Sequence, residues 1–130
     1  MNELLREWIE KAEGDYATAE RELRARKCVN YDAICFHAQQ TAEKYLKAFL
    51  FKNGVDFPKT HNLGELLELC LPLDASLDLH RDLLIHLDRY AVRYRYPGAL
   101  AEKEEAKETV RIARQVRSVL RQKLGLHEHD

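Results

Sequence analysis

Proline, glycine and cysteine are scarce in this sequence, which has three prolines, five glycines and three cysteines in 130 residues. So few chain-breaking residues argue against a protein built from short strands and tight turns. Cys28, Cys35 and Cys70 are odd in number and form no Cys-x-x-Cys pair, so we interpret them as buried or partly buried thiols. No apolar run approaches the roughly 20 residues that span a bilayer, which excludes a membrane protein.

An excess of charge of one sign is also missing. The 21 basic and 22 acidic side chains give a formal net charge of -1, so any site for a polyanion must be local. The first ten residues alternate charged and apolar side chains and do not read as a secretion signal, which together with the thiols predicts a cytoplasmic location. Glycine-rich phosphate loops and paired-carboxylate motifs are absent, and we predict neither a metal nor a cofactor.

Most of the chain consists of long segments in which apolar residues recur at the spacing of an amphipathic helix. We expect helices over about residues 2–26, 30–53, 63–70, 75–93 and 101–124. Gly54 suits a left-handed cap after the second helix, Pro72 ends the third, and Pro97 with Gly98 ends the fourth. Four long helices with short connectors predict an all-α, antiparallel up-and-down four-helix bundle with an additional short helix. We expect one domain over residues 1–130, with a disordered tail from about residue 125.

Two segments resemble the signatures of HEPN domains, namely CFHAQQTAEKYLKAFL from Cys35 to Leu50 and DRYAVRYRYPG from Asp88 to Gly98. The second helix of that family often reads aromatic-His-Ala-Gln-Gln-x-Ala-Glu-Lys, followed by Leu-Lys-Ala. The matching residues here are Phe36, His37, Ala38, Gln39, Gln40, Ala42, Glu43, Lys44, Leu46, Lys47 and Ala48. Thr60-His61 and an Arg95-Tyr96-Pro97 ending add support, so the resemblance covers nearly the whole chain.

The resemblance implies a five-helix bundle that is commonly a homodimer and is associated with a nucleotide or RNA. It also implies a partnership with a small nucleotidyltransferase encoded alongside, as in toxin-antitoxin or related pairs. Many HEPN toxins are metal-independent ribonucleases in which an Arg-x(4-6)-His motif places both side chains at the RNA phosphate. A cation then holds the phosphate, and an imidazole exchanges a proton near neutral pH.

That ribonuclease motif is missing at its usual place, because no histidine follows Arg89, Arg93 or Arg95 at the required spacing. Arg81 with His86 and Arg121 with His127 have the spacing elsewhere. Arg81 and His86 are five positions apart, which puts them about 140° apart around a helix. We therefore expect a non-catalytic module, and keep a ribonuclease that uses Arg81 and His86 as the alternative.

The basic and aromatic residues around the end of the fourth helix are the main candidate site. They are Arg89, Arg93, Tyr94, Arg95 and Tyr96. Arginine forks suit phosphates, tyrosine rings suit bases, and residues 89 and 93 share one helical face. In the alternative interpretation, Tyr90 and Tyr94 pack in the bundle and the arginines pair with acids such as Asp88 or Glu43.

A second candidate group, His37, Lys44 and Lys47, recurs near helical spacing beside Glu43, and this face is a candidate polar groove. Structural roles compete with that interpretation, because buried glutamines such as Gln39 and Gln40 hydrogen-bond between helices. We expect His61 to hold its connector by a backbone hydrogen bond, and Trp8 to belong to the core or a dimer face. A purely structural interaction domain is thus a third hypothesis.

Overall fold

The computed structural model describes residues 1–93 and 97–126, without the side chains of Val92 and Arg93. Every element in this part of the chain is helical. The elements are α1 (Glu3–Leu23), α2 (Tyr31–Lys52), α3 (Leu63–Cys70), the 3-10 helix η1 (Ala75–His80), α4 (Arg81–Asp88), α5 (Tyr90–Arg93) and α6 (Lys103–Lys123). The predicted all-α bundle is therefore confirmed.

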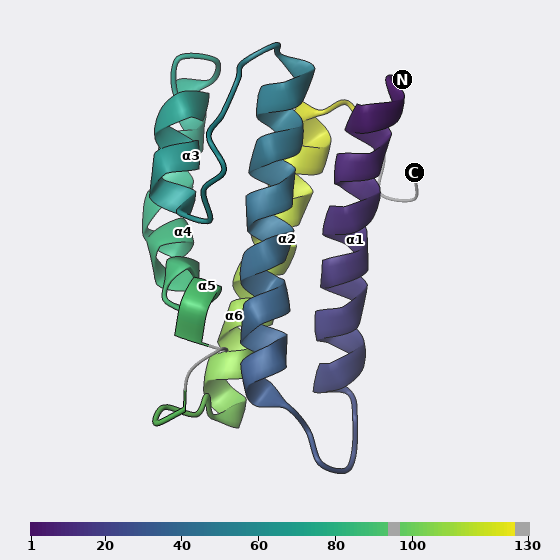
Figure 1. The fold of residues 1–130 in the computed structure, drawn as a ribbon, viewed down its shortest axis with the longest axis vertical. Coiled ribbons are helices and arrows are strands. Elements are labelled where there is room, and N and C mark those ends of the chain that lie inside the picture. Colours follow the sequence, from purple (N-terminus) through teal and green to yellow (C-terminus); the bar gives the residue numbers. More distant parts are fainter. Residues whose placement is uncertain (94–96, 127–130) are drawn as a thin grey trace.

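Helix α2 lies at the centre of the bundle. It has α1 on one side, α3, α4 and α5 on the other, and α6 behind it in the view of Figure 1. Its sequence fits this position, because Ile34, Ala38, Tyr45 and Leu50 are all 0% exposed although they do not share one narrow stripe. Polar residues on α2 are also buried, which brings its charged groups into contact with the neighbouring elements.

Short polar side chains fix where the helices begin. Their oxygen atoms accept hydrogen bonds from backbone N–H groups that have no partner within the first turn. The capping residues are Asn2 for α1, Asn30 for α2, Asn62 for α3 and Asp74 for η1. Gly54 follows α2 with a φ of +71°, as its predicted role in ending that helix requires.

The expected single helix over residues 75–93 is wrong. This segment forms η1, α4 and α5, with a break at Arg89. Leu84 before the break packs in the larger core cluster, whereas Tyr90 after it packs in a smaller cluster with Ile34. Tyr90 is 4% exposed, and its hydroxyl donates to Glu105 of α6 at 2.8 Å. Leu79, an apolar residue of the expected helix, is 84% exposed.

A polar network joins the three long helices inside the bundle. The Tyr45 hydroxyl of α2 and the Arg117 guanidinium of α6 both donate to the Glu13 carboxylate of α1, the arginine at 2.6 Å. Arg121, only 3% exposed, donates to the Tyr45 hydroxyl at 3.0 Å. Within the described residues, no helix is long and apolar enough to cross a membrane.

Candidate functional site

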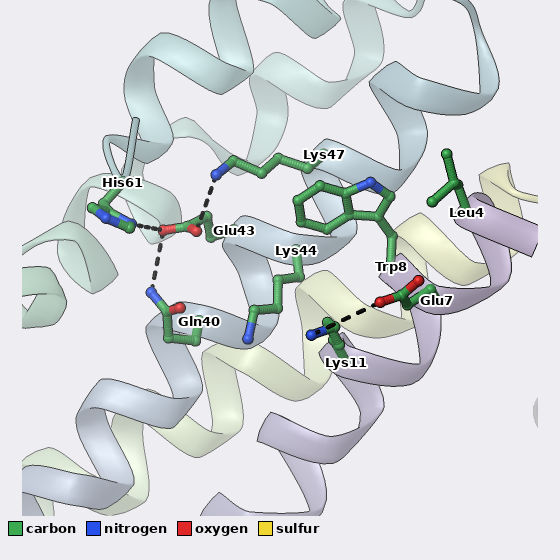
Figure 2. A pocket seen from close by; sticks show the side chains of 9 residues that line it. All are labelled: Leu4, Glu7, Trp8, Lys11, Gln40, Glu43, Lys44, Lys47 and His61. Carbon is green, nitrogen blue, oxygen red and sulfur yellow. Dashed lines mark hydrogen bonds and ion pairs between the residues drawn. The ribbon is translucent and has the colours of Figure 1, made fainter. Parts of the chain in front are cut away.

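A buried carboxylate, Glu43, organises the surface where α2 meets the α2–α3 connector. Its side chain is 4% exposed, so its charge must be balanced by the protein. Gln40 Nε2 donates to Glu43 Oε1 at 3.2 Å, and Lys47 Nζ donates to Oε2 at 3.2 Å. His61 Nδ1 lies 2.9 Å from Oε1, and all four side chains converge in Figure 2.

The connector is held to α2 by a second contact beside this one. Gln39 Nε2 donates to the backbone carbonyl of His61 at 3.0 Å, and Gln40 Nε2 donates to the Gln39 side-chain oxygen at 2.7 Å. Gln39 thus hydrogen-bonds from α2 to the connector, whereas the hydrogen bonds of Gln40 to Gln39 and Glu43 stay within α2. His61 is fixed both through its backbone and through its ring.

Lys47 connects the Glu43 cluster to two aromatic rings. Its ammonium lies 5.7 Å from the ring centroid of Trp8 and 5.8 Å from that of Phe57. The two rings contact each other edge to face, with centroids 5.8 Å apart. Because a cation is attracted to the face of an aromatic ring, these contacts hold Lys47 and the Trp8 indole in place.

A pocket of about 420 Å³ lies between α1 and α2 and is lined by Trp8, Lys47 and Glu43 among others. We call it the Trp8 groove. Figure 2 shows its lining side chains. They are Leu4, Glu7, Trp8, Lys11, Gln40, Glu43, Lys44, Lys47 and His61. The groove combines an apolar wall with a polar inner end, which is the usual composition of a small-molecule site.

A second pocket of about 540 Å³ lies on the other side of His61, and we call it the Arg89 groove. Its lining residues are Thr60, His61, Asn62, Ile85, Asp88, Arg89 and Ala91. His61 therefore borders both grooves, and its side chain is 59% exposed. The Nδ1 edge of this imidazole contacts Glu43, while much of the ring is exposed.

The two charged residues at the break between α4 and α5 have different environments. Arg89 is exposed, and no acid of the described part of the chain pairs with it. The Asp88 carboxylate instead accepts the backbone N–H of Leu63 at 2.8 Å, at the start of α3. Burial raises the pKa of Asp88 above its ordinary value, although backbone hydrogen bonds from Leu63 and Gly64 oppose that shift.

The second group of candidate residues is held by carboxylates. His37 Nδ1 lies 2.8 Å from Asp15 Oδ1, and Lys44 Nζ donates to Asp15 Oδ2 at 2.5 Å. Lys47 is paired with Glu43, as described above. Lys44 and Lys47 line the Trp8 groove, whereas His37 does not. The predicted polar groove is present on this face of α2, but its cations are largely balanced by neighbouring acids.

The side chains of Arg81 and His86 have separate partners. Arg81 donates to Glu68 at 2.6 Å and to Asp78 at 2.7 Å, whereas the His86 ring packs against Tyr90 with centroids 6.2 Å apart. Arg121 is buried in the helix network, and His127 lies outside the described residues. The geometry therefore does not bring Arg81 and His86 to a common point.

Much of the main candidate cluster falls outside what the structure describes. Tyr94, Arg95 and Tyr96 are not among the described residues, nor is the side chain of Arg93. Arg89 is described, and it lines the groove named after it. Tyr90 packs in the bundle, as the structural interpretation of this cluster expects.

Sequence reasoning did not identify His61 and Trp8 as parts of a site. Glu43 and His61 are separated by 18 positions, so no helical spacing connects them. The sequence did offer one signal for this site. Glu43 and Lys47 are charged residues four positions apart on a helix whose buried residues are mostly apolar. Trp8, which we expected in the core or a dimer face, is partly buried and lines a groove.

Comparisons with known proteins agree with this architecture. A family model described as HEPN domain matches residues 5–123. TT1696 from Thermus thermophilus has a TM-score of 0.75 and 28% identity, over 92% of this chain and 97% of that one. ST0689, an archaeal HEPN homologue, has a TM-score of 0.68 and 22% identity, over 92% and 96% of the two chains. No curated protein matches significantly.

These findings define an all-helical module of the nucleotide- or RNA-associated class. The chain belongs to the HEPN domain family, and the match covers the helices that build both grooves.

Proposed function

We propose that this protein is a non-catalytic HEPN module that binds a phosphate of a nucleotide or RNA through Arg89. The observation that carries the proposal is the exposed Arg89 guanidinium in a groove, without an acidic partner in the described part of the chain. A guanidinium is the side chain best suited to a phosphate, because its planar fork donates two parallel hydrogen bonds.

Neighbouring groups in the Arg89 groove add to this phosphate site. Asn62 uses its side-chain oxygen to accept the backbone N–H of Glu65 at 2.9 Å, which leaves its amide nitrogen as a donor. His61 uses Nδ1 toward Glu43, so its Nε2 remains for a ligand. The Asp88 carboxylate, which would repel a phosphate, is directed to the start of α3, where the helix dipole favours an anion.

The separate partners of Arg81 and His86 support a binding role in preference to catalysis. A metal-independent ribonuclease needs its arginine and histidine at one phosphate. Here Arg81 is occupied by Glu68 and Asp78, and His86 lies against Tyr90.

The proposal includes a homodimer and a small nucleotidyltransferase partner, and both rest on the family. A reading frame for such an enzyme beside this gene would support the partnership, and co-purification of the two proteins after co-expression tests it. Size-exclusion chromatography with light scattering tests the dimer at the same time. A monomer that does not bind the neighbouring enzyme would overturn this part of the proposal.

Equilibrium binding of ATP and of a single-stranded RNA tests the phosphate site itself. We expect Arg89→Ala to weaken binding about tenfold, since a hydrogen bond to a charged group contributes roughly 1.5–3 kcal/mol. Arg111→Ala is the matched control, because Arg111 is also exposed but lies on α6, where it pairs with Glu108. Arg93→Ala and Arg95→Ala extend the test to the rest of the predicted cluster. If none of the arginine variants changes binding, the third hypothesis, a structural interaction domain, is preferred.

A further inference from the structure

The Trp8 indole is a preorganised aromatic surface in a groove without an assigned role. Phe57 contacts it edge to face, and the Lys47 ammonium lies near its ring, so the side chain is fixed from two directions. Lys47 is itself held by the buried Glu43. An aromatic ring that is fixed before binding loses little conformational entropy when a flat ligand stacks on it.

The inner end of the Trp8 groove has an acceptor suited to such a ligand. Gln40 is 8% exposed, and its Nε2 donates to both Gln39 and Glu43. Its side-chain oxygen accepts no hydrogen bond from the described residues, and Gln40 lines the groove. A donor group on a flat ligand can hydrogen-bond to this oxygen at the lining of the groove.

The rim of the groove carries one weakly paired cation, Lys11. Lys11 is 59% exposed, and its only ion pair in the described part of the chain is a long contact of 4.0 Å with Glu7. The Lys44 ammonium is on the same rim, bound to Asp15. In Figure 2 the ammonium groups of Lys11 and Lys44 lie toward one another below the Trp8 indole. An anionic ligand that stacks on Trp8 would therefore have its charge near Lys11, whose ion pair is much longer than that of Lys44.

The Trp8 groove and the Arg89 groove meet at His61, which lines both. Their volumes, about 420 and 540 Å³, each fall in the roughly 300–1,000 Å³ range of a site for one small molecule. A chain of two or more nucleotides can occupy both grooves, whereas a mononucleotide occupies one. Stacking surfaces that alternate with cations are typical of single-strand binding sites.

We infer that the Trp8 groove holds a base of a single-stranded oligonucleotide whose neighbouring phosphate is bound at Arg89. This inference rests on the proposed function and adds its ligand class and a base-binding site. The oligonucleotide passes His61, stacks one base on Trp8, and places its backbone near Lys11. Because stacking does not depend on the sugar, RNA and DNA strands are both candidates, and the experiment compares them.

Trp8 is the only tryptophan of the chain, so intrinsic fluorescence reports on this groove directly. The full-length protein is titrated with single-stranded RNA and DNA hexamers of the same sequence and, separately, with AMP. Fluorescence of Trp8 and anisotropy of a labelled hexamer are followed in parallel. We expect saturable quenching by a hexamer at the concentration at which anisotropy rises, and at least about fivefold weaker hexamer binding by Trp8→Leu. AMP affinity is expected to be less affected.

A variant on the exposed rim keeps the test valid if Trp8→Leu does not fold. Lys11→Glu should weaken hexamer binding, while Lys107→Glu, the control, should not. Lys107 is 51% exposed and forms a similar ion pair with Glu104 on α6. The inference would be overturned if hexamer binding depends on Arg89 but does not quench Trp8, and if Trp8→Leu and Lys11→Glu bind the hexamer as tightly as the wild type. That result would leave the proposed function intact. Absence of binding of any nucleotide or hexamer would overturn both.

Discussion

The imidazole of His61 lies 2.9 Å from the carboxylate of Glu43, which joins the α2–α3 connector to the middle of α2. The carboxylate is 4% exposed and the imidazole 59%, so the contact links the interior of the bundle to its surface. Both grooves border His61. The position of His61, which lines both grooves, therefore depends on the buried carboxylate of Glu43.

Removing the Glu43 carboxylate should destabilise the fold. Glu43→Ala leaves Lys47, whose side chain is 9% exposed, without its counter-ion, and the loss of one partner of a buried pair costs about 3–5 kcal/mol. Urea unfolding measures the change. The double variant Glu43→Leu with Lys47→Met should recover much of the loss, because it removes both charges. A Glu43→Ala variant as stable as the wild type would show that the pair does not stabilise the fold.

The Glu13 network should make stability depend on acid pH. Burial raises the pKa of Glu13, but hydrogen bonds from Arg117 and Tyr45 outweigh it and hold that pKa below the ordinary 4.5. A lowered carboxyl pKa contributes stability that is complete above the unfolded value and is lost as pH falls through the folded value. Glu13→Gln should cost about 1–2 kcal/mol at pH 7 and flatten the decline in acid.

Unfolding midpoints in urea from pH 7 to pH 3 measure this dependence. Glu104→Gln is the control, because Glu104 is an exposed carboxylate that pairs only within α6, with Lys107, in the described part of the chain. Equal acid dependence of Glu13→Gln and the wild type would contradict the assigned role of the network.

Replacement of Gly14 and of Gly54 by alanine should change the stability of the protein in opposite directions. Gly14 lies within α1, and a methyl group added there meets nothing within 4 Å, so Gly14→Ala should stabilise the protein by about 0.5–1 kcal/mol. Gly54 has a φ of +71°, which strains any residue with a Cβ atom, so Gly54→Ala should cost about 1 kcal/mol. Thermal unfolding of the two variants gives both signs, and the same sign for both would contradict this account.

The pure protein should not cleave RNA in the presence of a chelator. Arg81 is bound to Glu68 and Asp78, so it does not share a phosphate site with His86. Incubation of the wild type and His86→Ala with a labelled RNA, followed by gel electrophoresis, measures cleavage. Metal-independent cleavage that disappears in a folded His86→Ala protein would establish the ribonuclease alternative.

The helices could be predicted from sequence because their signals are local. Asn62 and Asp74 precede apolar periods, and Gly54 follows one, so the bounds of α2 and α3 agree closely with expectation. The break at Arg89 could not be found in this way. After the break, Tyr90 bonds to Glu105 of α6, a contact across 15 positions that helical periodicity does not contain.

The candidate site was only partly predictable for a similar reason. Arginine and lysine residues that suit phosphate are visible in the sequence, but their partners are not. Asp15 of α1 balances Lys44 across 29 positions, whereas Arg89 has no such acid in the described part of the chain. Only the fold distinguishes a cation that is already paired from one that is open to a ligand.

The salt dependence of single-stranded RNA binding tests the phosphate contact at Arg89 most directly. Each phosphate contact to a single strand contributes about 0.7 to the slope of log K against log salt concentration. We expect Arg89→Ala to bind more weakly and with a slope smaller in magnitude by about 0.7, while Arg111→Ala keeps the slope of the wild type. An unchanged affinity and slope in Arg89→Ala would contradict the proposal that Arg89 holds a phosphate.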